Sequence, residues 1–380
     1  MIPYGHQSID DSDIKAVIKV LKSDWLSQGP KIAEFEEALA KYCGAKYAVI
    51  FSSGTAALHA AYFSAGLKSG DEFITTPLTF AATGNAGLYL GAKPVFADIG
   101  EDLNLDPEET VKKINSKTKL ISVVDFAGLP AKLDELKKIA RKHNLVLVED
   151  GCHALGASYK GKKIGSVADM TAFSFHPVKS ITTGEGGAVL TDNKDYYEKM
   201  KVFRHHGIVR DPSKFKNKSD GDWYHEMQEL GFNYRITDIQ AALGISQLKR
   251  LDKFIKARKK IASAYNQAFK KFSDKIKLPS DSKDFSSSWH IYILRLKGKL
   301  EKKRAEVFKK LREAGIGAQV HYLPVYLHPY YQSLGYKKGL CPKAEEYYET
   351  AISLPIFPDL KLKDQQFVIK KLNEILKSYL

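Results

Sequence analysis

Short apolar runs alternate with helical patterns between residue 30 and about residue 200, and this alternation restricts the fold more than any other feature. The runs are apolar at successive positions, which is typical of strands that are buried on both faces. Such strands, separated by helices, indicate an α/β fold with a mostly parallel central sheet covered by helices. The expected strands are residues 46–53, 71–76, 93–98, 119–125, 145–150, 170–175 and 187–192.

The second half of the chain has a different pattern. Residues 236–272 read as one long or broken helix that leads out of the sheet region, and residues 210–231 are polar and read as a long surface loop. Beyond the helix we expect strands at 289–296 and 316–322 and helices at 302–314 and 363–380. Two domains are therefore predicted. An N-terminal arm and a large α/β domain occupy residues 1–245, and a linking helix and a small C-terminal α+β domain occupy residues 246–380.

Charge and composition exclude several classes of protein. The net charge of +15 arises from lysines interleaved with glutamates, as in residues 132–143 and 301–315, so no nucleic-acid surface is expected. No apolar run approaches the roughly 18 residues of a membrane span, and the N-terminus does not resemble a secretory signal. Three widely spaced cysteines indicate neither a disulfide framework nor a metal site and suit the cytoplasm.

The segment 174-SFHPVKSITTGEGG-187 contains the residue that points most directly to chemistry. An apolar run ends there, and a proline-restrained turn then presents Lys179. A lysine at the carboxyl end of a parallel strand faces the crevice where α/β proteins bind ligands. Desolvation there lowers the lysine pKa and frees the amine for Schiff-base chemistry. The alternative is an ordinary surface lysine.

Three companion motifs are expected at the same edge of the sheet. In 52-SSGTAAL-58 a strand passes into a helix, and the first N–H groups of that helix could bind a phosphate. The alternative is that the segment is an ordinary helix N-cap with no ligand. Asp150 ends another strand and could keep a ring nitrogen protonated, or cap the next turn. Phe80 could stack on a flat ring, or belong to the core.

The order of these motifs resembles one family over nearly the whole chain. The segments SGT (53–55), TPLTFAAT (76–83), EDGCHA (149–154), SFHPVKSITTGEGG (174–187) and GFNYRITDIQAALG (231–244) are similar to the DegT/DnrJ/EryC1/StrS family. Residues 24–36 and 319–331 match as well. Members are sugar-nucleotide aminotransferases that depend on pyridoxal 5'-phosphate (PLP) and have the aspartate-aminotransferase fold (fold type I).

The resemblance implies a role for each matching residue. Lys179 would hold the cofactor covalently and move the proton during catalysis, and Asp150 would pair with the ring nitrogen. The other implied cofactor contacts are Gly54, Thr55, Phe80, His153, Ser174 and Asn233. Asn233 would reach in from a second subunit, which implies a homodimer with shared active sites. The implied substrate contacts are Tyr4, Trp25, Ser27, Tyr234, His321 and Tyr322.

Within the family, the segments 124-VDFAG-128, 174–187 and 319-QVHYLPVY-326 are most similar to the members that act in pseudaminic acid biosynthesis. This implies transfer of an amino group from L-glutamate to C4 of a UDP-linked 4-keto-6-deoxy-L-hexose. Lysine rather than histidine at position 179 favours transamination over dehydration. The alternatives are amination of another ketosugar, at C3 or C4 and linked to dTDP or GDP, or a PLP-binding regulatory protein.

Overall fold

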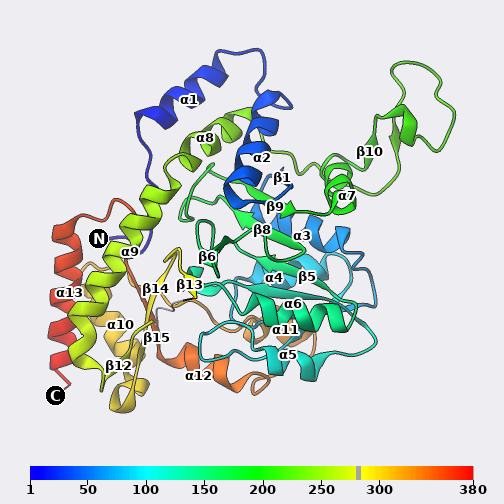
Figure 1. Cartoon of the computed structure of the whole chain (residues 1–380). Helices are drawn as coiled ribbons and strands as arrows, with labels where there is room; N and C mark the ends of the chain where they lie inside the picture. The colour runs from blue at the N-terminus through cyan, green and yellow to red at the C-terminus, as the bar shows by residue number, and fades with distance from the viewer. Residues whose placement is uncertain (280–283, 380) are drawn as a thin grey trace.

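A seven-stranded sheet forms the centre of the molecule (Figure 1). The computed structural model describes residues 1–279 and 284–379. Every strand except β9 runs in the same direction, so the prediction of a mostly parallel α/β sheet is confirmed. In spatial order the strands are β1 (Tyr47–Phe51), β9 (Gly187–Thr191), β8 (Met170–Ser174), β5 (Val146–Asp150), β4 (Thr118–Val124), β2 (Glu72–Thr75) and β3 (Lys93–Phe96).

Helices bury both faces of this sheet, because successive side chains of a strand point to opposite sides. In β1, Ala48 and Ile50 belong to one apolar core, whereas Val49 and Phe51 belong to another. The helices α2 (Pro30–Cys43), α6 (Leu133–Lys142) and α8 (Asp238–Leu248) contribute to the first core. The second core lies under α3 (Gly54–Ser64), α4 (Ala81–Leu88) and α7 (Lys194–Arg204). The helix α5 (Pro107–Lys113) packs beside α6.

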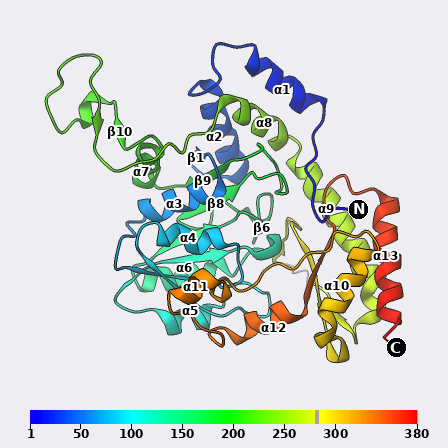
Figure 2. The same cartoon turned by 180° about the vertical axis from the view of Figure 1, so that it is seen from behind.

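The chain from Leu251 onward builds a second, antiparallel sheet. Its strands are β12 (Ile276–Lys277), β14 (Tyr292–Leu296) and β15 (Ala351–Leu354), with β14 in the middle. The helices α9 (Leu251–Phe269), α10 (Arg304–Glu313) and α13 (Leu362–Lys377) enclose a core with it. Both views show α9 and α13 side by side (Figures 1 and 2). Two short helices, α11 (Pro329–Ser333) and α12 (Pro342–Thr350), follow α10 in the chain, and Tyr331 of α11 packs on α4, where its hydroxyl donates to Asn85 at 2.8 Å.

Smaller elements fill the connections. The strands β13 (Phe285–Ser286), β6 (Ser158–Tyr159) and β7 (Lys162–Lys163) form a minor sheet. Residues 210–231, which we call the arm, extend away from the rest of the molecule in both views (Figures 1 and 2). The strands β10 (Ile208–Val209) and β11 (Glu226–Met227) pair at its base, and the rest is largely irregular, as predicted. No helix in the described ranges is both long and apolar enough to cross a bilayer.

Two predictions for the second half of the chain have different outcomes. The broken-helix alternative for residues 236–272 is confirmed, because α8 and α9 are separate helices. The strand predicted at 316–322 is wrong. The segment forms only isolated bridges: the N–H of Gly317 donates to the carbonyl of Ile2 at 2.7 Å, and Gln319 pairs with Ser353 of β15. The strand β15, which was not predicted, occupies the place beside β14.

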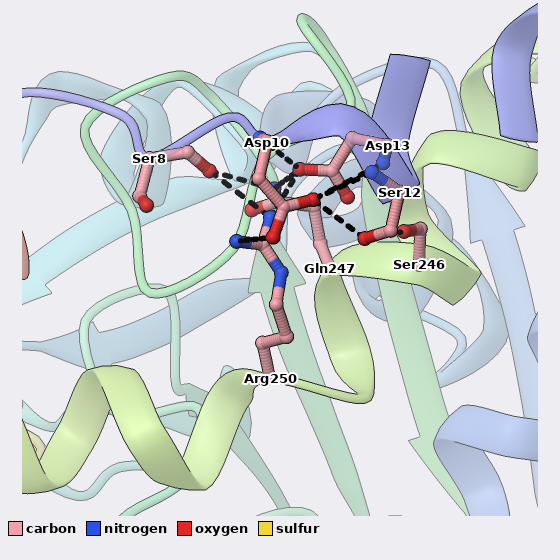
Figure 3. A network of polar contacts seen from close by, with 7 residues as sticks. All are labelled: Ser8, Asp10, Ser12, Asp13, Ser246, Gln247 and Arg250. Atoms are coloured by element: carbon pink, nitrogen blue, oxygen red, sulfur yellow. Dashed lines mark hydrogen bonds and ion pairs between the residues drawn. The ribbon is translucent and has the colours of Figure 1, made fainter. Parts of the chain in front are cut away.

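A polar network holds the N-terminal helix α1 (Asp11–Leu21) against the junction of α8 and α9 (Figure 3). The guanidinium of Arg250 pairs with the buried carboxylate of Asp13 and, at 2.6 Å, with Asp10. Gln247 donates to Asp13 at 2.7 Å and to the carbonyl of Ser8 at 2.8 Å. These contacts fix the segment that precedes α1, whose residue Tyr4 accepts a hydrogen bond from the N–H of Ile356 at 3.0 Å.

We predict that Arg250→Met lowers the free energy of unfolding by about 3 kcal/mol, because the Asp13 carboxylate would remain buried without its cation. Urea unfolding followed by circular dichroism measures the change. The matched control is Lys31→Met, which removes the exposed pair Lys31–Glu34 and should cost less than about 1 kcal/mol. Equal effects of the two substitutions would show that the network contributes no more than a surface ion pair.

Candidate active site

A cavity of about 540 Å³ opens at the carboxyl ends of the central strands. Val124 at the end of β4, Asp150 at the end of β5 and Ser174 at the end of β8 all line it. This is the edge at which open α/β sheets bind ligands. The volume lies within the range of roughly 300–1,000 Å³ that is usual for small-molecule sites.

Most of the residues singled out in the sequence meet in this cavity, although they are far apart along the chain. They come from the N-terminal segment, the central sheet and the region before α11. The predicted site residues that line the cavity are Tyr4, Gly54, Thr55, Phe80, Asp150, His153, Ser174, Lys179, His321 and Tyr322.

Four predicted residues lie outside the cavity of their own chain. Trp25 is 56% exposed in the segment after α1, and Ser27 pairs with Thr237 just before α8. Asn233 pairs with His205 in the segment that follows the arm. The carbonyl of Tyr234 accepts the N–H of Ser52 at 2.8 Å, so Tyr234 lies directly behind the start of α3. The roles expected for these four residues remain predictions.

One end of the cavity has the features of an anion site. The helix α3 begins at Gly54, and Ser53 caps it by accepting the N–H of Ala56 at 3.1 Å. Gly54 and Thr55, in the first turn, line the cavity, and N–H groups in a first turn lack acceptors within their helix. A Cβ at Gly54 would lie 2.8 Å from the Cβ of Ser174, so glycine is required for this close approach. The Ser174 hydroxyl thus lies beside the positive end of the helix dipole.

Lys179 lies in the turn after β8, where its N–H donates to the carbonyl of His176 at 2.9 Å. Its side chain lines the cavity. Burial lowers the pKa of its ammonium group, and the nearby Cys152 and Asp150 oppose this shift. A lowered pKa increases the fraction of neutral amine, which is the form that attacks a carbonyl carbon.

Asp150 is buried, and two donors hold its carboxylate in place. The hydroxyl of Thr83 donates to Oδ2 at 2.6 Å, and the N–H of Cys152 donates to Oδ1 at 3.2 Å. A carboxylate fixed in this way, at the wall of a cavity, can bind a protonated ring nitrogen and stabilise its positive charge. The arrangement therefore suits a ligand with a basic aromatic nitrogen.

Histidines and tyrosines form the wall of the cavity nearest the C-terminal region. The Nε2 of His153 is 3.3 Å from the hydroxyl of Tyr322, and the Nδ1 of His321 is 2.8 Å from the hydroxyl of Ser353. Burial lowers the pKa of His321 to about 4, and burial with the nearby Lys179 lowers the pKa of His153 far below its usual value. Both imidazoles are therefore neutral at physiological pH and can donate or accept one hydrogen bond at each nitrogen.

Sequence reasoning missed three residues of this site. Thr83 supports Asp150, Cys152 lines the cavity, and His290 reaches the cavity from the segment before β14. Cys152 lies two residues after Asp150, so the sequence could have indicated it, whereas Thr83 is 67 residues away from Asp150. No local pattern distinguishes His290 from other residues of a buried strand. Within the described part of the chain, no group of three or more potential ligands is arranged to bind a metal ion.

Comparisons with known proteins identify relatives over nearly the whole chain. The chain is 45% identical over 381 residues to the UDP-4-amino-4,6-dideoxy-N-acetyl-beta-L-altrosamine transaminase of Campylobacter jejuni subsp. jejuni serotype O:23/36 (strain 81-176), covering 99% of this chain and 98% of the relative. The structure of Helicobacter pylori PseC, described as an aminotransferase of pseudoaminic acid biosynthesis, superposes with a TM-score of 0.93 at 37% identity, covering 99% of both chains.

A further solved structure is the PLP-form of the putative sugar aminotransferase Spr1654 from Streptococcus pneumoniae. Its TM-score is 0.92 at 30% identity, and the match covers 100% of this chain and 99% of that one. Residues 7–373 match the DegT/DnrJ/EryC1/StrS aminotransferase family itself. The resemblance read from the motifs, and with it the expected class of enzyme, is therefore confirmed. The chain belongs to the DegT/DnrJ/EryC1/StrS aminotransferase family.

Proposed function

We propose that the protein uses PLP to transfer the amino group of L-glutamate to C4 of a UDP-linked 4-keto-6-deoxy-L-hexose, in a pathway to pseudaminic acid. The observation that carries the chemistry is the meeting of Lys179, Asp150 and the start of α3 in one cavity. The choice of substrate is supported by the 45% identity to the altrosamine transaminase of C. jejuni over nearly the whole of both chains.

The residues of the cavity fit PLP at each of its polar groups. The N-terminus of α3 with Ser174 would hold the phosphate, because this end of a helix binds anions. Asp150 would hold the ring nitrogen, and His153 would contact the ring hydroxyl. Phe80 lines the cavity, yet 61% of it is exposed, so it has a ring face free to cover an aromatic ligand. When bound, PLP supplies an aldehyde that combines with amines and a ring that takes up an electron pair.

Lys179 and Asp150 divide the chemistry between them. The amine of Lys179 would bind the cofactor covalently at rest. Once the amine of the donor displaces it, the free lysine would move a proton between the substrate carbon and C4′ of the cofactor. Asp150 would keep the ring nitrogen protonated and so increase the capacity of the ring to accept electrons. Neutral His321 and Tyr322 would contact the sugar nucleotide from the opposite wall, together with Tyr4.

The active form would be a homodimer with shared sites. The apolar side chains of Ile14, Ile18 and Leu21 follow one face of α1 at helical spacing and are each more than 40% exposed. An apolar stripe of this kind indicates a protein–protein contact. The arm also presents Trp223, which is 75% exposed. Asn233, outside the cavity of its own chain, would donate to the phosphate in the partner, and Trp25, Ser27 and Tyr234 would contribute from the same side.

The cavity of one chain supplies little positive charge for a nucleotide sugar. Among the residues described as lining the cavity, Lys179 is the single lysine or arginine, whereas a nucleoside diphosphate sugar carries two negative charges. The arm has no net positive charge, because its basic residues lie among five acidic ones, so single side chains such as Arg210, Lys216 or Lys218 would have to meet the diphosphate of the partner's substrate. We place the reaction in the cytoplasm, in keeping with three cysteines that form no disulfide.

We predict that Asp150→Asn lowers kcat by about 100-fold or more while the affinity for PLP changes less, since an amide cannot sustain the positive charge on the ring nitrogen. Stopped-flow kinetics and an absorbance titration with PLP separate the two quantities. Thr83→Val keeps the carboxylate but removes its 2.6 Å donor, so it should cost about tenfold in kcat. A nearly normal kcat in Asp150→Asn would reduce Asp150 to a structural cap.

The substrate is tested with purified protein, L-glutamate and a panel of UDP- and dTDP-linked ketosugars. We expect 2-oxoglutarate and a 4-amino sugar from the UDP-linked 4-keto-6-deoxy-L-hexose, identified by mass spectrometry and NMR. Lys179→Ala serves as the inactive control, and borohydride reduction followed by peptide mapping should label Lys179 in the wild type. Product from a different ketosugar would revise the substrate, whereas a label on another lysine would overturn the site.

Shared sites are tested by mixing two impaired variants. Lys179→Ala removes the amine of one chain, and Asn233→Asp sets a negative charge against the phosphate that the partner would bind. Each heterodimer would contain one intact site, so statistical exchange should restore roughly a quarter of the wild-type activity. Native mass spectrometry of a size-tagged variant verifies exchange. Confirmed exchange without recovered activity would show that each site belongs to one chain.

A further inference from the structure

His290 lines the active-site cavity, although it lies in the segment before β14 and far from every catalytic motif. It is 7% exposed, and its ring lies on the ring of His153, with the centroids 4.4 Å apart and the planes inclined by 35°. The Nδ1 atoms of both rings are buried and have no hydrogen-bond partner among the described residues. The contact between the two side chains is therefore one of ring faces rather than a hydrogen bond.

His153 needs support from outside its own segment. It follows β5 in a turn and belongs to no helix or strand, so its backbone is not fixed by a regular ladder. The hydroxyl of Ser288 donates to the carbonyl of His153 at 2.5 Å, and the hydroxyl of Tyr322 lies 3.3 Å from its Nε2. With the ring of His290, these contacts hold the backbone, one ring nitrogen and one ring face of His153.

The segment that carries His290 is itself tied to α9 and to the residues after β15 by a buried arginine. The fully buried guanidinium of Arg258, on α9, donates to the carbonyls of His290 at 3.3 Å and Ile356 at 2.8 Å. Within residues 1–279 and 284–379 this guanidinium bonds only to carbonyl oxygens, all through Nη1, and its Nε and Nη2 are buried without a partner. The neighbouring Trp289 has a φ of 53°, a left-handed conformation that non-glycine residues keep only where the surroundings impose it.

We infer that His290 is a positioning residue, which fixes the orientation of the His153 imidazole and thereby its contact with the hydroxyl on the PLP ring. This inference rests on the proposed function, because it concerns the cofactor that His153 would bind. Contacts run from Arg258 through the backbone and ring of His290 to the ring of His153. The C-terminal region thus determines the geometry of a cofactor contact in the sheet region.

Positioning has an electronic consequence. A fixed donor from His153 to the ring oxygen would reduce the stabilisation that this oxygen could give to a protonated nitrogen at Lys179. If the ring of His153 is free to turn, that donor is lost part of the time, and the pKa of the lysine-bound cofactor rises. Burial and the nearby His153 and Lys179 lower the pKa of His290 itself far below its usual value, so its ring adds no positive charge.

The test compares His290→Ala with His290→Phe in the full-length protein. His290→Ala should weaken PLP binding roughly tenfold, which is the usual loss of affinity when a residue that orients a ligand-binding side chain is removed. It should also raise the pKa of the lysine-bound cofactor, measured by absorbance between pH 5 and 10. His290→Phe keeps a flat ring against His153 and should restore both values to near those of the wild type. His290→Asn, which lacks the ring, replaces His290→Ala if the latter does not fold.

The structural control is Leu372→Ala, a buried change in α13 remote from the cavity. It should lower the melting temperature without altering PLP affinity or the cofactor pKa. The inference is overturned if His290→Ala behaves in the same way, or if His290→Phe is as impaired as His290→Ala. Failure of the wild type to bind PLP would instead refute the proposed function, so the two failures are distinguishable.

Discussion

The close approach of α3 to the ends of β8 and β9 is the contact on which the site depends. It is possible because two residues lack side chains. A Cβ at Gly54 would lie 2.8 Å from the Cβ of Ser174, and a Cβ at Gly187 would lie 2.4 Å from the carbonyl oxygen of Ser53. Both distances are too short for real atoms, so any other residue would push the helix away from the sheet. With both glycines present, the positive end of α3 lies beside Ser174, five residues before Lys179.

Burial then sets the chemical character of the cavity. Removing Lys179 from water disfavours its charged form, while the nearby Cys152 and Asp150 favour that form, and the lowered pKa is the balance of these effects. The same burial, together with the positive charge of Lys179, keeps His153 and His321 neutral. Lys179, the fixed carboxylate of Asp150 and two uncharged imidazoles can therefore lie in one cavity, because neither histidine needs a counter-ion.

The C-terminal region and the N-terminal segment complete the site rather than merely covering it. His290, His321 and Tyr322 form one wall, and Tyr4 is added from the opposite end of the chain. Each is held by buried polar contacts that join distant elements, with Arg258 beneath His290 and the Asp13–Arg250 pair behind the N-terminal segment. Buried charges of this kind contribute little net stability, but removing one partner is costly, so they favour a single arrangement.

The sequence by itself determined the mostly parallel sheet, its seven strands and the family. These features depend on local periodicity and on motifs such as 174–187, in which neighbouring residues carry the signal. It also indicated Lys179 and Asp150, because the carboxyl ends of parallel strands share one edge of a sheet.

The tertiary structure alone decided which distant segments of the chain come together around that edge of the sheet. Residues 316–322 have a strand-like pattern, yet they form only isolated bridges, with Ile2 at one position and with Ser353 of β15 at another. His290 stands in an ordinary buried strand pattern, and only the packing of α9 and β14 brings its ring onto His153. Such contacts are long-range, and no local pattern of hydrophobicity or turn residues encodes them.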